Sequence, residues 1–176
     1  MREVGFEFLD RLILTPLELM ATIKPMLIAL AILFVIQWFS HGSAPFTQLI
    51  RLTILSFLPY LGAVVAGTVL VPVLLPYIPG RALSWKGWLL GLIWAGVCIW
   101  FSYPATDWLQ DAVYLLLLPP ITSYLGMNFT GATTYTSLSG VVREMKIVLP
   151  AQIISVGLGI ISLIVTTCVK AKENIS

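Results

Sequence analysis

Residues 128–146 read NFTGATTYTSLSGVVREMK, a polar run that separates two apolar stretches of the chain. It combines an asparagine, several hydroxyl side chains, two glycines and a short charged cluster. Irregular polar backbone of this kind persists beside a bilayer only where protein, water or a ligand satisfies it. We therefore expect this loop to join two membrane helices and to carry function. The same run also fits a plain connector with a helix cap at Ser137 or Ser139.

The rest of the chain is strongly apolar. Of its 176 residues, 59% are hydrophobic and 10% are charged, whereas a soluble domain has about 25% charged residues. This composition predicts an all-α, polytopic integral membrane protein. The net charge of +2 does not favour nucleic acid as a partner, and two cysteines with one histidine do not favour a protein-only zinc site. Met1–Arg11 is rich in charge without an apolar core, so no signal peptide is expected there.

Five stretches approach the roughly 20 residues that a bilayer requires. We expect residues 1–15 to form an amphipathic segment at the membrane surface, followed by a helix that starts at Thr15 and Pro16. Residues 16–176 are then a five-helix membrane domain. Its spans are expected at about 16–39, 49–77, 87–102, 111–127 and 147–169.

Small residues and prolines in these spans predict how the helices pack. Small side chains recur one turn apart at Gly62 with Ala66, Ala63 with Gly67, Gly87 with Gly91 and Ala95, and Ser155 with Gly159, which favours close helix contacts. Pro59, Pro72 and Pro76 are expected to break the second span. Pro119 and Pro120 leave carbonyls near Leu115 and Leu116 without helical donors. That fits either a broken helix that lines a cavity or a kink accommodated by neighbouring helices.

The distribution of Lys and Arg predicts the orientation. Seven of them belong to the N-terminal arm and to the loops after the second and fourth spans: Arg2, Arg11, Lys24, Arg81, Lys86, Arg143 and Lys146. Three belong to the other side: Arg51, Lys170 and Lys172. By the positive-inside rule, the N-terminus and the 128–146 loop are cytoplasmic and the C-terminus is outside a prokaryotic cytoplasmic membrane.

Few side chains suggest chemistry of their own, and none is a candidate catalytic group or metal ligand. Cys98 and Cys168 are expected at different depths, as packing residues. Arg81 and Lys86 fit either the positive-inside signal or contact with an anionic partner. No charged residue lies deep in a predicted span and no internal repeat is evident, which argues against an ion-coupled carrier.

Three segments carry a family resemblance: MNFTGATTYTSLSGVVREM (127–145), PYIPGRALSWKGWLLGL (76–92) and LTPLEL (14–19). Over nearly the whole chain, the sequence resembles the membrane domain of the mercury-methylation corrinoid protein family. In that family a cytoplasmic corrinoid-binding domain precedes a five-span membrane domain. The family's cap-helix motif, Asn-x-Trp-Cys-Ala-x-Gly-Lys, supplies the cysteine that ligates cobalt. Neither Cys98 nor Cys168 has those neighbours, and the corrinoid domain is absent from this sequence.

The resemblance implies transfer of a methyl group from a methylcorrinoid to inorganic mercury, with a ferredoxin-like iron–sulfur protein as reductant. This chain would be the membrane half of a split protein, a stand-alone relative, or a piece cut at the domain boundary. Its part would be to anchor and dock a cytoplasmic corrinoid-binding protein, with the cofactor on that partner. The docking residues would be Asn128, Thr130, Gly131, Thr133, Thr134, Tyr135, Thr136, Ser137, Gly140, Arg143, Arg81 and Lys86.

Two other functions remain open on the sequence. A small transporter or permease subunit could use the proline-broken second and fourth spans as a pathway. A structural subunit could recruit other proteins without touching a ligand. A neighbouring gene for a soluble corrinoid protein would favour docking, and a solute-dependent thermal shift would favour transport.

Overall fold

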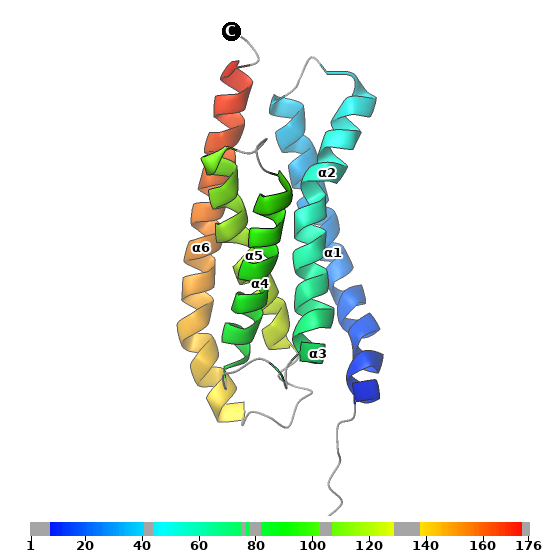
Figure 1. The fold of residues 1–176 in the computed structure, drawn as a ribbon, viewed down its shortest axis with the longest axis vertical. Helices are drawn as coiled ribbons and strands as arrows, with labels where there is room; N and C mark the ends of the chain where they lie inside the picture. The colour runs from blue at the N-terminus through cyan, green and yellow to red at the C-terminus, as the bar shows by residue number, and fades with distance from the viewer. Residues whose placement is uncertain are drawn as a thin grey trace, which may run out of the picture.

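The computed structural model describes residues 8–40, 44–74, 77, 82–102, 107–128 and 138–173. Within these ranges the elements are all helical: α1 (Phe8–Ser40), α2 (Phe46–Val65), the π-helix η1 (Ala66–Leu70), α3 (Val71–Leu74), α4 (Leu83–Ser102), α5 (Trp108–Asn128) and α6 (Leu138–Glu173). The predicted all-α class is confirmed. Consecutive long helices run in opposite directions, so α1 begins at one end of the bundle and α6 ends at the other (Figure 1).

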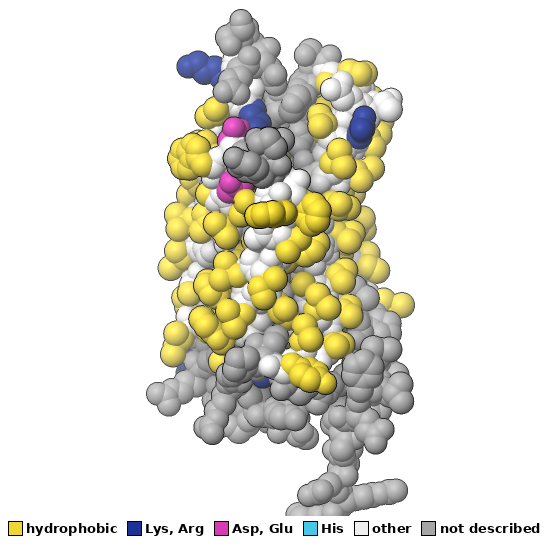
Figure 2. Space-filling view, viewed as in Figure 1, with side chains coloured by type: hydrophobic (Ala, Val, Ile, Leu, Met, Phe, Trp, Pro, Cys, Tyr) yellow, Lys and Arg dark blue, Asp and Glu magenta, His cyan; other side chains and the backbone are white. Residues whose placement is uncertain are grey.

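Among the described residues, four helical stretches are long and apolar enough to cross a membrane: Thr22–Ser40, Phe46–Leu74, Ser84–Ser102 and Met145–Lys170. Figure 2 shows hydrophobic side chains across the middle of the visible face, with Lys, Arg, Asp and Glu side chains toward its ends. Phe101 is 83% exposed and Ile147 is 70% exposed, which is unusual for water-facing surface but ordinary for surface that faces lipid. The exterior is compatible with an integral membrane protein.

The predicted span 111–127 forms the helix α5, which is long enough to cross a membrane at 21 residues but is not among the four apolar stretches. It lies at the centre of the bundle, in contact with α2, α4 and α6. Leu118 and Thr122 are fully buried, and Ser123 is 1% exposed. Because neighbouring helices cover it, α5 can carry polar side chains that a lipid-facing helix could not hold cheaply.

Close packing of α4 on α5 depends on the small residues that the sequence singled out. A Cβ atom on Gly91 would lie 2.5 Å from Pro119 Cα, and one on Gly87 would lie 2.7 Å from Ser123 Cα. Ala95, one turn further along, is fully buried. The predicted small-residue face is confirmed, and its partner is the proline-bearing surface of α5.

The two prolines in α5 do not break the helix, which runs unbroken from Trp108 to Asn128. Pro120 has no N–H to give to the Leu116 carbonyl. Instead, Ser155 Oγ on α6 donates to that carbonyl at 2.9 Å. One turn along, a Cβ on Gly159 would lie 2.5 Å from Leu117 Cδ2, so α6 approaches closely here. The broken-helix interpretation is therefore wrong, because a neighbouring helix replaces the lost donor.

The second span also continues through its prolines. Helical structure extends from Phe46 to Leu74 through Pro59 and Pro72, with a π-helical turn at Ala66–Leu70. The predicted breaks at Pro59 and Pro72 are wrong, and Pro76 lies outside the described residues. The second and fourth spans, which the transporter alternative takes as proline-broken, are therefore continuous helices over the described residues.

The contacts of this span explain its small residues. Trp94 Nε1 on α4 donates to the Pro59 carbonyl at 2.8 Å, and the Trp94 ring lies where a Cβ on Gly62 would be. A Cβ on Gly67 would lie 2.7 Å from Leu125 Cβ on α5. Trp94 thus packs between α4 and α2, with its indole N–H bonded to a carbonyl.

The first helix begins earlier than the sequence suggested. It starts at Phe8, so Thr15 and Pro16 lie inside α1 and the predicted helix start is wrong. Proline is tolerated within membrane helices where neighbouring groups accommodate the missing bond. The apolar residues 12–14 extend the helix toward its N-terminus, ahead of that proline.

Candidate functional site

Most of the docking residues predicted from sequence lie outside the part of the chain that the structure describes. Thr130, Gly131, Thr133, Thr134, Tyr135, Thr136, Ser137 and Arg81 lie outside the described residues. The backbones of Asn128, Gly140 and Arg143 belong to α5 and α6. Lys86, in the first turn of α4, is the member whose side chain is described, and it is only 8% exposed.

Contacts between side chains and backbone bring the ends of α3, α4 and α5 together. Ser123, near the end of α5, donates to the Ser84 carbonyl at the start of α4, with an Oγ–O distance of 2.8 Å. Val71 on α3 meets Gly126 on α5, where an added Cβ would be 3.0 Å from Val71 Cγ1. The end of α3, the start of α4, the end of α5 and the start of α6 thus lie at the same end of the bundle (Figure 1).

The start of α6 extends beyond that end. Gln152 Nε2 donates to Ser123 Oγ at 2.8 Å, so these two residues lie at the same level. From Ser123, α5 continues to Asn128, whereas α6 began at Leu138. At ~1.5 Å per residue, α5 ends about 7.5 Å past this level and α6 begins about 21 Å past it. The first turns of α6 therefore project roughly 13 Å past the end of α5. In Figure 1 the start of α6 lies lower than the end of α5.

A buried polar chain lies just inside this end. Gln152 donates to Ser123, which donates to the Ser84 carbonyl. Within the described part of the chain, Gln152 Oε1 is buried without a hydrogen-bond partner. Leaving a buried acceptor unpaired costs about 1–3 kcal/mol. Sequence analysis missed these hydrogen bonds, although a glutamine in an otherwise apolar stretch was the available signal.

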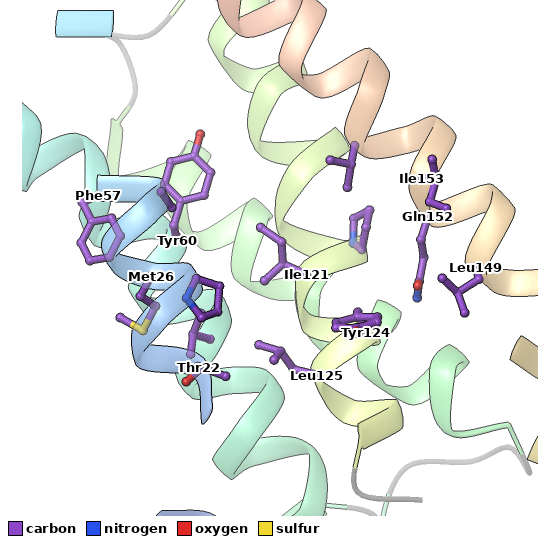
Figure 3. A pocket seen from close by; sticks show the side chains of 15 residues that line it. Thr22, Met26, Phe57, Tyr60, Ile121, Tyr124, Leu125, Leu149, Gln152 and Ile153 are labelled. Atoms are coloured by element: carbon purple, nitrogen blue, oxygen red, sulfur yellow. The ribbon is translucent and has the colours of Figure 1, made fainter. Parts of the chain in front are cut away.

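A lateral groove of about 450 Å³ opens between α1 and α2 on one side and α5 and α6 on the other (Figure 3). Met26 and Phe57 face Ile121 and Leu125 across it. Its full lining is Thr22, Pro25, Met26, Ala29, Phe57, Tyr60, Val64, Pro120, Ile121, Tyr124, Leu125, Leu149, Gln152, Ile153 and Val156. The volume is in the usual range of ligand pockets, about 300–1,000 Å³, and the walls are almost entirely apolar.

A smaller polar pocket of about 250 Å³ lies between the same helices, toward the C-terminal end of α6. Lys170 Nζ lies 2.7 Å from Gln110 Oε1, and Gln110 Nε2 donates to Tyr114 Oη at 3.2 Å. Across the pocket, Gln37 Nε2 donates to Ser56 Oγ at 2.9 Å. Other polar side chains that line it are Ser40, Tyr60, Thr166 and Thr167. Sequence analysis treated Lys170 only as a topological charge and assigned no role to this end.

The two cysteines differ in surroundings, and both thiols are free. Cys98 packs in a core cluster with Ala63, Ala95, Tyr114 and Leu118. Cys168 is exposed near the end of α6, opposite the projecting start of that helix. Among the residues that the structure describes, no three His, Cys, Asp or Glu side chains group to hold a metal ion.

Comparison with known proteins gives no relative for this chain. No protein-family model, curated protein or solved structure matches it.

Proposed function

We propose that this chain is the membrane anchor and docking domain of a corrinoid-dependent methyl-transfer system that resembles mercury methylation. In this proposal all five long helices cross a prokaryotic cytoplasmic membrane, with α5 packed against α2, α4 and α6. The N-terminus and the 128–146 loop are cytoplasmic, and the C-terminus is outside. A cytoplasmic corrinoid-binding protein docks on the loop end, and a ferredoxin-like protein reduces its cofactor.

The observation that carries the proposal is the convergence of the family-like motifs at one end. The described helix ends within segments 76–92 and 127–145, which are the start of α4, the end of α5 and the start of α6, lie at the same end of the bundle. The second segment includes the turns of α6 that project past α5, with Gly140 and Arg143 among them. In this proposal the projecting start of α6 stands outside the bilayer, where a cytoplasmic partner can bind it.

Neither cysteine of this chain fits the role of cobalt ligand. Cys98 is enclosed in the core of the bundle, and Cys168 lies at the end opposite the projecting start of α6. The methyl chemistry therefore belongs to a corrinoid held by the partner. What remains for this chain is to hold that partner at the membrane and to fix its orientation.

Co-purification tests the proposal. The tagged chain is isolated from its own cells in a gentle detergent, and the eluate is analysed by mass spectrometry and by visible absorbance for a corrinoid. We expect a corrinoid-binding protein in the eluate, and we expect it to be lost when Thr133, Thr134 and Tyr135 are replaced by alanine. The control replaces Thr47 and Gln48, exposed polar residues at the opposite end, and should retain the partner.

The other results have distinct meanings. A partner protein without any corrinoid would make the chain a structural recruiting subunit. An eluate with neither partner nor corrinoid would refute docking. Undiminished binding by the triple variant would refute the assignment of the loop.

A further inference from the structure

The lateral groove and the polar pocket follow one another along the same interface. On α1 the groove is lined by residues 22–29 and the pocket by residues 33–40. Both have their other walls on α2, α5 and α6. Tyr60 lines both, so its ring marks the place where they meet. The two cavities adjoin at Tyr60 and are here called the elongated site, which is apolar along the groove and polar at the pocket.

The polar end has the chemistry of an anion site. Among the described residues that line the pocket, Lys170 is the one Lys, Arg, Asp or Glu, and Asp111 lies near enough to act on the lining residue Tyr114. An ammonium carries three donors, and the Gln110 amide oxygen takes one of them. Ser56 accepts from Gln37 and keeps its own hydroxyl proton for another acceptor. The pocket therefore matches a small group that is negatively charged and rich in acceptor oxygens, such as a phosphate diester.

The dimensions match a lipid lying along the bundle. From Gln37, in the pocket, to Pro25, in the groove, α1 advances twelve residues, which is about 18 Å at ~1.5 Å per residue. One leaflet of the hydrocarbon core is roughly 15 Å deep, half of the ≈ 30 Å bilayer core. An acyl chain in the groove would therefore reach about as deep as the chains of the surrounding leaflet.

We propose that this elongated site binds one glycerophospholipid, with an acyl chain in the lateral groove and the phosphate beside Lys170. The lipid fills the gap between the α1–α2 pair and the α5–α6 pair, and it buries apolar lining that the helices do not cover for one another. This inference is independent of the docking proposal, because the phosphate end of the site lies opposite the projecting start of α6.

The test compares two tryptophan substitutions on one helix. Ala29 lines the groove, whereas Ala31 is exposed on α1 and is not part of the lining. Ala29→Trp should fill the groove and displace the lipid, and Ala31→Trp should not. Each purified variant is photolabelled in detergent micelles with a phosphatidylglycerol that bears a photoreactive acyl chain. Retained phospholipid is measured by phosphorus content and lipid mass spectrometry.

We expect about one retained phospholipid per chain in the unaltered protein and in Ala31→Trp, and several-fold less in Ala29→Trp. Lys170→Met leaves the groove open, so it tests the site even if the tryptophan variant misfolds. It should weaken labelling about tenfold, as expected for the loss of a charge-assisted hydrogen bond. Equal labelling in all variants would mean ordinary boundary lipid and would overturn the proposal. Retention of a phosphorus-free amphiphile, such as a quinone, would overturn the choice of occupant.

Discussion

Substitution of Gly91 by alanine tests the packing that defines the centre of the bundle. The new Cβ would lie 2.5 Å from Pro119 Cα and 3.1 Å from Thr122 Cβ, whereas ordinary contact begins at 3.4 Å. The contact with Pro119 is with backbone, which cannot rotate away, so α4 and α5 must separate by roughly 0.9 Å. Overpacking of this kind costs about 1–3 kcal/mol.

Gly96→Ala is the matched control on the same helix, because a Cβ there meets nothing within 4 Å. Both substitutions gain up to about 1 kcal/mol of helix propensity, so the difference between the two variants isolates the clash. Unfolding is followed by circular dichroism as sodium dodecyl sulfate is added to dodecyl maltoside micelles. Gly91→Ala should unfold at a clearly lower fraction of dodecyl sulfate than Gly96→Ala. If the two variants unfold together, α4 and α5 are not packed as described.

Three further predictions concern hydrogen bonds and topology. Ser155→Ala should destabilise the fold by about 1–3 kcal/mol because the Leu116 carbonyl loses its donor, whereas Ser162→Ala, which loses a 3.4 Å bond, should cost less in the same unfolding assay. Gln152→Leu should be neutral or stabilising, since it loses one bond worth about 0.5–1.5 kcal/mol and removes an unpaired acceptor that costs about 1–3 kcal/mol; a clear loss of stability would show that Oε1 has a partner. A cysteine in place of Ser137 should react with an impermeant maleimide in inverted vesicles and not in right-side-out spheroplasts, and labelling from outside would reverse the topology.

The small residues of the sequence predicted the tightest helix contacts correctly. Gly87, Gly91 and Ala95 do lie against α5, and Gly159 lies against Leu117. Such contacts are readable because a residue without a bulky side chain at helical spacing has few other uses in a membrane helix. The pattern could not name the partner surface, since spacing within one helix carries no information about which helix lies opposite.

Prolines were harder to interpret from sequence. The carbonyl freed by Pro120 was placed correctly near Leu116, but its donor, Ser155, is on another helix. Whether a proline breaks a membrane helix depends on that donor, which is far away in the chain. The π-helical turn at Ala66–Leu70 had no sequence signal that we used. The central position of α5 was also missed, although Thr122 and Ser123 made it the least lipid-compatible of the long helices.

The candidate site was likewise predictable from sequence only in part. The sequence directed attention to the loop end through its motifs, and several of those residues lie outside the described part of the chain. The lateral groove and the polar pocket could not be predicted, because their lining comes from four helices that are distant in sequence. Lys170 shows this well, since its partner Gln110 is 60 positions away.

Site-specific photocrosslinking in cells tests the central claim most directly. A photoreactive amino acid is introduced at Arg143, in the projecting start of α6, and in a separate strain at Lys172, near its opposite end. The docking account predicts a crosslink to a corrinoid-binding protein from position 143 and none from position 172. A crosslink from position 172 alone, or no corrinoid-binding protein from either position, would contradict it.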